Sequence, residues 1–151
     1  MLFRSNLYGA STRVDRVMRN ARIAERTAAY GIRGETVDGN DVLAVHEAAR
    51  SAADDCRAGR GPVLLELLTY RRTGHSRRDA CNYQPKEERE EWLRRDPIDR
   101  LGTLLIERGM ADQGELDRVR SELRAEFQSA VESARRQPMP TVADLTTDVL
   151  A

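Results

Sequence analysis

Residues 35–69 read ETVDGNDVLAVHEAARSAADDCRAGRGPVLLELLT, and this stretch decides the fold. Residues 35–37 are a short strand candidate, because β-branched residues precede a turn-forming Asp-Gly pair. Asn40 then caps a helix on which apolar residues recur at spacings of three and four, namely Val42, Val45, Ala49, Ala52 and Cys56. This periodicity predicts one buried helix face.

The end of the same stretch predicts a buried strand. Gly59 is a natural stop for the helix, and Pro62 prevents its continuation. The apolar run at residues 62–69 follows at once and is typical of a strand that is covered on both faces. Strand, helix and strand in succession form a βαβ unit. We therefore predict an α/β fold built on a parallel sheet with flanking helices.

The segments before this unit are shorter and less regular. Residues 1–3 are apolar and indicate the end of a strand, and residues 7–13 contain small and polar residues that suit a loop. Residues 14–29 carry a weak helical stripe. After the unit, residues 70–84 form a long polar segment. A loop of this length inside a domain is usually functional or disordered.

The last third of the chain is predicted to be helical. A charged helix from Lys86 to Arg95 carries Trp92 as its apolar anchor, and Asp96-Pro97 starts a second helix that ends near Gly109. A third helix begins after Asp112 and ends before Pro138. Because the composition changes near residue 84, we assign residues 1–84 to an α/β domain and residues 85–151 to a helical tail.

Composition excludes several classes of protein. The 151 residues contain 25 basic and 25 acidic side chains, and this balance argues against a general nucleic-acid-binding protein. The two cysteines, Cys56 and Cys81, lack the spacing of a zinc site, and we expect Cys56 to be buried on the helix stripe. The sequence contains no run of about 18 apolar residues, so we predict no membrane span. We expect a cytosolic, cytoplasmic protein.

The most informative polar segment is residues 69–79, which read TYRRTGHSRRD. This segment follows the buried strand directly, and ligands of open α/β sheets bind just beyond the carboxyl ends of the strands. Arginine matches phosphate oxygens with a planar fork of donors. The segment therefore predicts a phosphate-type anion site that contains a titratable histidine, His75.

Several of these residues have a plainer interpretation. Arg72, Arg77 and Arg78 each also fit solvated loop charges, and a lone histidine such as His75 also fits a surface position. Asn6 also fits a turn residue at the end of the first strand. Asp79 is expected to pair within the loop. On the residues alone, the plainer interpretation is the more common one for Asn6, His75 and the three arginines.

Four stretches in this order resemble one family. They are residues 6–12 (NLYGAST), residues 37–42 (VDGNDV), residues 61–76, which end in GHS, and residues 96–98 (DPI). The chain resembles the C-terminal part of the alpha subunit of thiamine-diphosphate-dependent 2-oxo acid dehydrogenases. That family includes enzymes for pyruvate and branched-chain 2-oxo acids as well as the acetoin dehydrogenases.

The resemblance implies an incomplete thiamine-diphosphate-binding fold and a set of site residues. The side chain of Asn6 and the backbone carbonyl of Tyr8 match the family's Mg²⁺ ligands, and hard oxygen ligands are those that magnesium prefers. Arg71 matches an arginine that pairs with the diphosphate of the cofactor or orders the loop, and His75 matches a histidine that forms a hydrogen bond with the diphosphate. His75 is also the implied catalytic residue, with a role in proton transfer or reductive acylation.

The resemblance also implies a reaction and partners. The reaction is oxidative decarboxylation of a 2-oxo acid, or acetoin cleavage, with acyl transfer to lipoamide. The implied partners are a beta subunit, in a heterotetramer, and a lipoyl-bearing acyltransferase. The substrate and any phosphorylation of Ser76 stay open.

The chain also departs from the family pattern. It has no Gly-Asp-Gly motif, which supplies another magnesium ligand in the family, and Arg4-Ser5 stands where family members carry Glu-Asn. We therefore expect a partial alpha subunit that is inactive alone. The alternatives are a non-catalytic remnant and a small anion-binding or helical interaction module.

Overall fold

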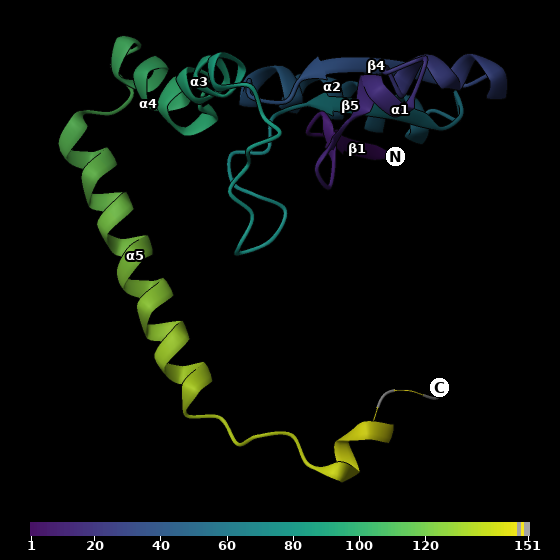
Figure 1. The fold of residues 1–151 in the computed structure, drawn as a ribbon. Coiled ribbons are helices and arrows are strands. Elements are labelled where there is room, and N and C mark those ends of the chain that lie inside the picture. Colours follow the sequence, from purple (N-terminus) through teal and green to yellow (C-terminus); the bar gives the residue numbers. More distant parts are fainter. Residues whose placement is uncertain (148, 150–151) are drawn as a thin grey trace. The chain divides into compact units, whose positions relative to one another are not determined.

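A three-stranded parallel sheet organises the first part of the chain (Figure 1). The computed structural model describes residues 1–147 and 149. The sheet contains β1 (Leu2–Ser5), β4 (Arg33–Asp38) and β5 (Val63–Leu68) in the order β1-β5-β4. Ser5 and Asp38 both lie opposite Leu68, so the carboxyl ends of the three strands lie together at one end of the sheet. The predicted α/β class with a parallel sheet is confirmed.

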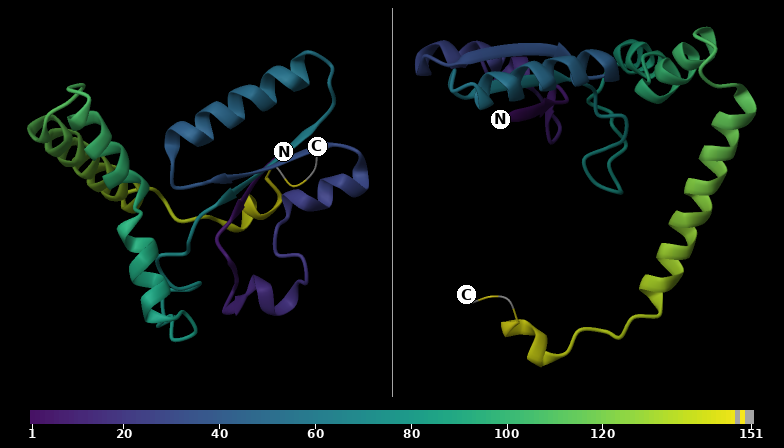
Figure 2. Two further views of the ribbon diagram at one scale, coloured as in Figure 1. Left: turned by 90° about the horizontal axis from the view of Figure 1, so that it is seen from above. Right: turned by 180° about the vertical axis from the view of Figure 1, so that it is seen from behind.

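The apolar core lies between the sheet and α2 (Val42–Arg57), which runs beside β4 and β5 (Figure 2). It consists of alternate residues of the strands together with one helix face, namely Val37, Ala48, Val63, Leu65 and Leu67, with Ala44, Val45, Ala49 and Ala52 packed against them. Because strand side chains alternate between faces, Glu66 points to the opposite side. Val45, Ala49 and Ala52 of the predicted helix stripe thus contribute to the core, whereas its first residue, Val42, is 44% exposed and its last residue also lies outside the core.

That last residue, Cys56, is exposed, and the prediction that it is buried was wrong. Cys56 borders a shallow apolar pocket of about 220 Å³ that also includes Met1 and Leu2. Within the described residues β1 is one of the two edge strands of the sheet. The apolar end of α2 therefore extends beyond the surface that the sheet covers.

The N-cap of α2 is Asp41, not Asn40 as predicted. The Asp41 carboxylate accepts hydrogen bonds from the N–H groups of Leu43 (3.1 Å) and Ala44 (3.0 Å). Asn40 is buried instead, and its amide is used elsewhere: it donates to the carbonyl of Arg95 (2.8 Å) and accepts from the Thr69 hydroxyl (2.8 Å). Its partners come from distant parts of the chain, so the local pattern did not identify them.

Residues 14–29 do not form the single helix that was predicted. They contain a short helix, α1 (Val14–Val17), and the start of a 3₁₀ helix, η1 (Ala24–Tyr30). Between them the side chain of Asn20 accepts a hydrogen bond from the N–H of Arg22 (3.0 Å), and such local bonds compete with helix formation. Residues 7–13, predicted as a loop, contain a two-stranded hairpin of β2 (Tyr8–Gly9) and β3 (Thr12–Arg13).

The helices after the sheet agree with the predicted positions. They are α3 (Lys86–Arg94), α4 (Pro97–Glu107) and α5 (Gln113–Arg135), and a 3₁₀ helix, η2 (Val142–Thr146), follows. Asp112 caps α5 in a reciprocal capping box with Glu115. Among the described residues, no helix has both the length and the apolar character needed to cross a bilayer.

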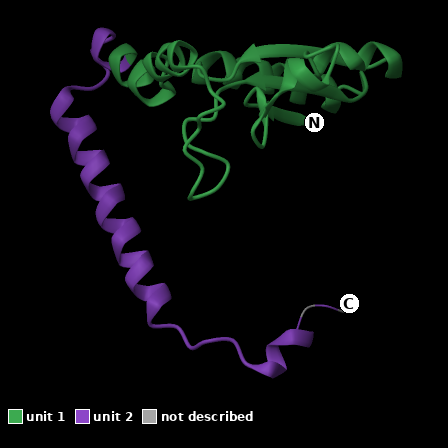
Figure 3. Cartoon of the chain, viewed as in Figure 1, with its two compact units in different colours: residues 1–104 green, residues 105–151 purple. Residues whose placement is uncertain are grey.

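The chain divides into two compact units, Met1–Leu104 and Leu105–Ala151 (Figure 3). The first unit contains the sheet, α3 and most of α4, and the second contains α5 and η2. The assignment of residues 1–84 to a cofactor-binding domain with a helical tail at 85–151 stays a prediction.

Candidate functional site

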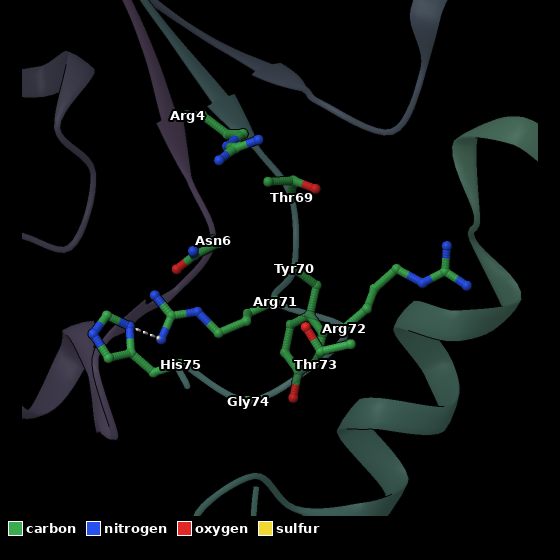
Figure 4. Close-up of a pocket in the computed structure, with 9 residues that line it drawn as sticks. All are labelled: Arg4, Asn6, Thr69, Tyr70, Arg71, Arg72, Thr73, Gly74 and His75. Atoms are coloured by element: carbon green, nitrogen blue, oxygen red, sulfur yellow. Dashed lines mark hydrogen bonds between the residues drawn. The ribbon is translucent and has the colours of Figure 1, made fainter. Parts of the chain in front are cut away.

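The candidate site lies where β1 and β5 end. Asn6 follows β1, and residues 69–75 follow β5, and because Ser5 pairs with Leu68 the two segments leave the sheet side by side. They line an open pocket of about 440 Å³ together with Arg4 (Figure 4). Asn6, Arg71 and His75, which lie up to 69 positions apart by residue number, thus meet at one place.

The turn after β1 is held by local bonds. The side-chain oxygen of Asn6 accepts from the N–H of Tyr8 (3.1 Å), and the carbonyl of Leu7 accepts from the N–H of Val14 (2.9 Å). Leu7 has φ 69°, a left-handed conformation that a leucine rarely adopts. This backbone conformation turns the chain into the β2–β3 hairpin and brings the Asn6 amide and the Tyr8 backbone into the same small segment.

The contacts of the Tyr8 ring hold the turn in place. It is buried, packs edge-on against Tyr70 at 5.9 Å between ring centroids, and donates its hydroxyl to Glu88 of α3 (2.8 Å). Burial raises the pKa of both phenols above their ordinary value of 10.0, so both stay neutral at physiological pH. The Tyr8 backbone is therefore fixed by a side chain that does not line the pocket.

Arg71 joins the two sides of the pocket. Its guanidinium donates to the carbonyl of Ala10 (3.0 Å) and, at 3.5 Å, to the carbonyl of Tyr8, and it also lies 3.1 Å from Nδ1 of His75. A guanidinium cannot accept a hydrogen bond, so Nδ1 is the acceptor. The neutral imidazole therefore carries its proton on Nε2, which leaves an N–H group available to a ligand.

Asp79 holds the loop that carries His75. Its carboxylate accepts from the N–H of Cys81 (2.9 Å), the hydroxyl of Tyr83 (2.7 Å) and the N–H of His75 (2.8 Å). These three donors, in that order of importance, hold the pKa of Asp79 below its ordinary value of 3.8. The expectation that Asp79 pairs within its loop is confirmed.

Two contacts that the sequence did not indicate hold Arg71 and the neighbouring Tyr70 in place. The side chain of Gln84 donates to the carbonyl of Arg71 (3.0 Å). The ring of Tyr70 stacks on Trp92 of α3, with 5.5 Å between the centroids and 7° between the planes. Both contacts join residues that are 13 or more positions apart, and no local pattern signals them.

The remaining arginines of the loop differ in environment. Arg72 forms an ion pair with the buried Asp96 at the start of α4, while its own side chain stays 54% exposed, so this charge is both solvated and paired. Its guanidinium points away from Arg71 and His75 (Figure 4). Arg77 and Arg78 are exposed and do not line the pocket, which agrees with solvated charges.

The chemistry of the pocket fits an anion. No acidic side chain is among the nine lining residues, whereas Arg4 and Arg71 are positively charged and His75 can donate a hydrogen bond. The described residues include no cluster of three His, Cys, Asp or Glu that could hold a metal. A metal at this place would take the amide oxygen of Asn6 and the carbonyl of Tyr8. Each accepts one hydrogen bond already and keeps a second lone pair.

Comparison with known proteins assigns the chain to a family. Residues 2–143 match the model of a family described as the dehydrogenase E1 component. The chain belongs to this family. The resemblance predicted from four sequence stretches is therefore confirmed, and it extends over nearly the whole chain.

Individual relatives agree with the assignment. The chain is 38% identical over 147 residues to a pyruvate dehydrogenase E1 component subunit alpha of Rhizobium meliloti, and the match covers 97% of this chain and 42% of the relative. It is 37% identical to the alpha subunit of an acetoin:2,6-dichlorophenolindophenol oxidoreductase of Bacillus subtilis, with 96% of this chain and 43% of the relative covered. A human testis-specific pyruvate dehydrogenase E1 alpha subunit is 38% identical, with 93% and 36% covered. The chain thus spans less than half of each of these relatives.

Proposed function

We propose that this chain forms one wall of the thiamine-diphosphate site in the alpha subunit of a 2-oxo acid or acetoin dehydrogenase. The observation that carries the proposal is the convergence of Asn6, Arg71 and His75 on one pocket that no acidic side chain lines. Family membership supports the choice of cofactor, because relatives named as pyruvate and acetoin dehydrogenase subunits match along this segment.

In this proposal each residue has a distinct task. Arg71 donates to diphosphate oxygens, as its planar fork of N–H groups allows. Asn6 and the carbonyl of Tyr8 bind the Mg²⁺ ion that accompanies the diphosphate. His75 is the catalytic residue: its Nε2–H exchanges a proton with the ligand, while Arg71 fixes its tautomer through Nδ1. Bound thiamine diphosphate would supply the carbanion chemistry for decarboxylation.

The whole activity belongs to a larger assembly in this proposal. We infer that the chain acts in the cytoplasm together with the rest of an alpha subunit, with a beta subunit in a heterotetramer, and with a lipoyl-bearing acyltransferase that receives the acyl group. The pocket is open and its lining residues come from two adjacent segments, so further residues are needed to enclose a cofactor. We therefore expect no turnover from this chain alone.

Calorimetric titration with Mg²⁺ and thiamine diphosphate tests the proposal. We expect saturable binding to the wild-type chain and roughly tenfold weaker binding to both Arg71→Gln and His75→Ala, because each change removes a charged or polar partner of the diphosphate. Arg77→Gln is the matched control, since Arg77 belongs to the same loop but does not line the pocket.

Two outcomes would contradict the proposal. Absence of heat with the wild-type chain removes the cofactor site from this polypeptide, and equal affinity in all four proteins removes the assigned roles. Inorganic pyrophosphate is titrated in parallel without metal. If it binds as tightly as the complete cofactor, the chain is an anion-binding module.

A further inference from the structure

An apolar stripe runs the length of α5 and is largely exposed. Its residues recur at spacings of three and four, and they are Leu116, Val119, Leu123, Phe127, Ala130 and Ala134. Val119, Leu123 and Phe127 are 44%, 59% and 71% exposed. At about 1.5 Å per residue the 23-residue helix is about 35 Å long. A continuous apolar surface of this kind marks a protein contact.

The charges beside the stripe are separated by sign. At about 100° per residue, Arg120, Arg124 and Arg135 project along one border of the stripe, and Glu115, Glu122 and Glu126 along the other. Each border has one counter-charge at its outer edge: Asp117 pairs with Arg120 at 3.3 Å on the basic side, and Arg118 pairs with Glu122 at 2.9 Å on the acidic side. The stripe therefore has a basic side and an acidic side.

This arrangement is self-complementary in one orientation. When two copies of such a helix pack face to face and run in the same direction, a two-fold axis parallel to them places the basic border of each against the acidic border of the other. When they run in opposite directions, the axis is perpendicular to the helices, and it places basic against basic and acidic against acidic. Opposite charges at such borders select partner and orientation.

We propose that α5 is the surface on which a second copy of this chain docks, with the two helices parallel. The apolar stripes pack against each other, and Glu122 and Glu126 of each copy face Arg120 and Arg124 of the other. The second copy is the occupant that the charge pattern specifies, because a single sequence supplies both borders. The inference rests on unit Leu105–Ala151 alone and is independent of the cofactor site.

Sedimentation velocity on the 151-residue chain over a range of concentrations tests the proposal. We expect a reversible dimer for the wild type. The double variants E122R/E126R and R120E/R124E each place one sign on both borders over residues 120–126, and each should dimerise at least roughly tenfold more weakly than the wild type. An equimolar mixture of the two should recover the dimer, because opposite borders then meet again.

Glu132→Arg is the matched control. Glu132 projects from the side of α5 opposite the stripe, so this reversal should leave dimerisation unchanged. A wild-type chain that is monomeric at all concentrations would overturn the proposal, as it would show that the stripe is covered within the chain or needs no partner. Dimerisation by both border variants at the wild-type strength would overturn it equally.

Discussion

Gly74 is a position in the site loop where the backbone leaves no room for a side chain. A Cβ atom there would lie 2.4 Å from the carbonyl oxygen of Asp79 and 2.5 Å from its Cβ, both closer than non-bonded atoms approach. The Asp79 carboxylate in turn accepts a hydrogen bond from the backbone N–H of His75. The glycine therefore permits the close contact that fixes the histidine.

Gly74→Ala should therefore displace His75 and weaken binding of Mg²⁺ with thiamine diphosphate about tenfold, because a pre-formed loop lowers the cost of ordering on binding. Calorimetry measures the affinity, and hydrogen exchange of residues 74–81 measures the loop. Gly9→Ala is the control, since a Cβ at Gly9 meets its nearest atom at 4.0 Å. Wild-type affinity and exchange in Gly74→Ala would refute this account of the loop.

At the residue scale, the sequence identified the polar groups but not their supports. Asn6, Arg71 and His75 stand in recognisable stretches after strands, and so they could be predicted. The contacts of Arg71 with Ala10 and Gln84 join distant segments and become visible only in the folded chain. The exchange of roles between Asn40 and Asp41 has the same cause, because Arg95 and Thr69 occupy the Asn40 side chain.

At the scale of elements, β5 is the centre of the sheet, and its apolar side chains hold α2 in place. Leu65→Ala should lower the free energy of unfolding by about 2–5 kcal/mol, because Leu65 is 3% exposed and its loss leaves a cavity in the core. Urea denaturation measures the change. Leu43→Ala on α2 is the control, since Leu43 is 45% exposed and should cost much less. Equal costs for the two variants would show that the core does not depend on β5.

Asp38 joins the end of β4 to α4. Burial disfavours its charged form, but hydrogen bonds from Arg100 (2.9 Å), the N–H of Asn40 (3.0 Å) and Arg95 (3.2 Å) outweigh burial and hold the pKa of Asp38 below 3.8. Because the folded-state pKa is lowered, the charged carboxylate stabilises the fold above pH 3.8. This stabilisation is lost as the pH falls through the lowered pKa.

The stability difference between wild type and Asp38→Asn should therefore be largest near neutral pH and shrink in the acid range below pH 3.8. Urea denaturation of both proteins over a series of pH values measures it. A difference that stays constant throughout the acid range would show that these hydrogen bonds do not favour the charged form.

The elements that the sequence predicted well have strong local signals. The middle of the α2 stripe, the apolar run of β5, the Asp96 side chain that accepts from the N–H of Ile98 (2.8 Å) at the start of α4, and the cap of α5 are all predictable from neighbouring residues. Residues 14–29 have a weak stripe and an Asn20 turn, so the predicted helix breaks into two short pieces. The burial of Cys56 was predicted wrongly for a different reason. Helical periodicity identifies the apolar face of a helix, but it does not show how far the sheet extends to cover that face.

At the scale of the whole molecule, the proposed site depends on the carboxyl ends of β1 and β5 lying side by side. Parallel pairing in register brings Asn6 and the Arg71–His75 loop to the same pocket, although the chain spans less than half of the relatives described above. In the proposed function, a ligand at this two-sided site contacts both segments at once. A site formed by the loop alone would not involve the turn after β1.

The most direct test is a titration of the isotope-labelled chain with Mg²⁺ and thiamine diphosphate, followed by nuclear magnetic resonance at two reporters. The reporters are the side-chain amide of Asn6 and the imidazole of His75, which belong to different segments of one pocket. The account predicts that both signals shift along one binding curve with one dissociation constant. Shifts at His75 without any at Asn6, or no shift at either, would contradict it.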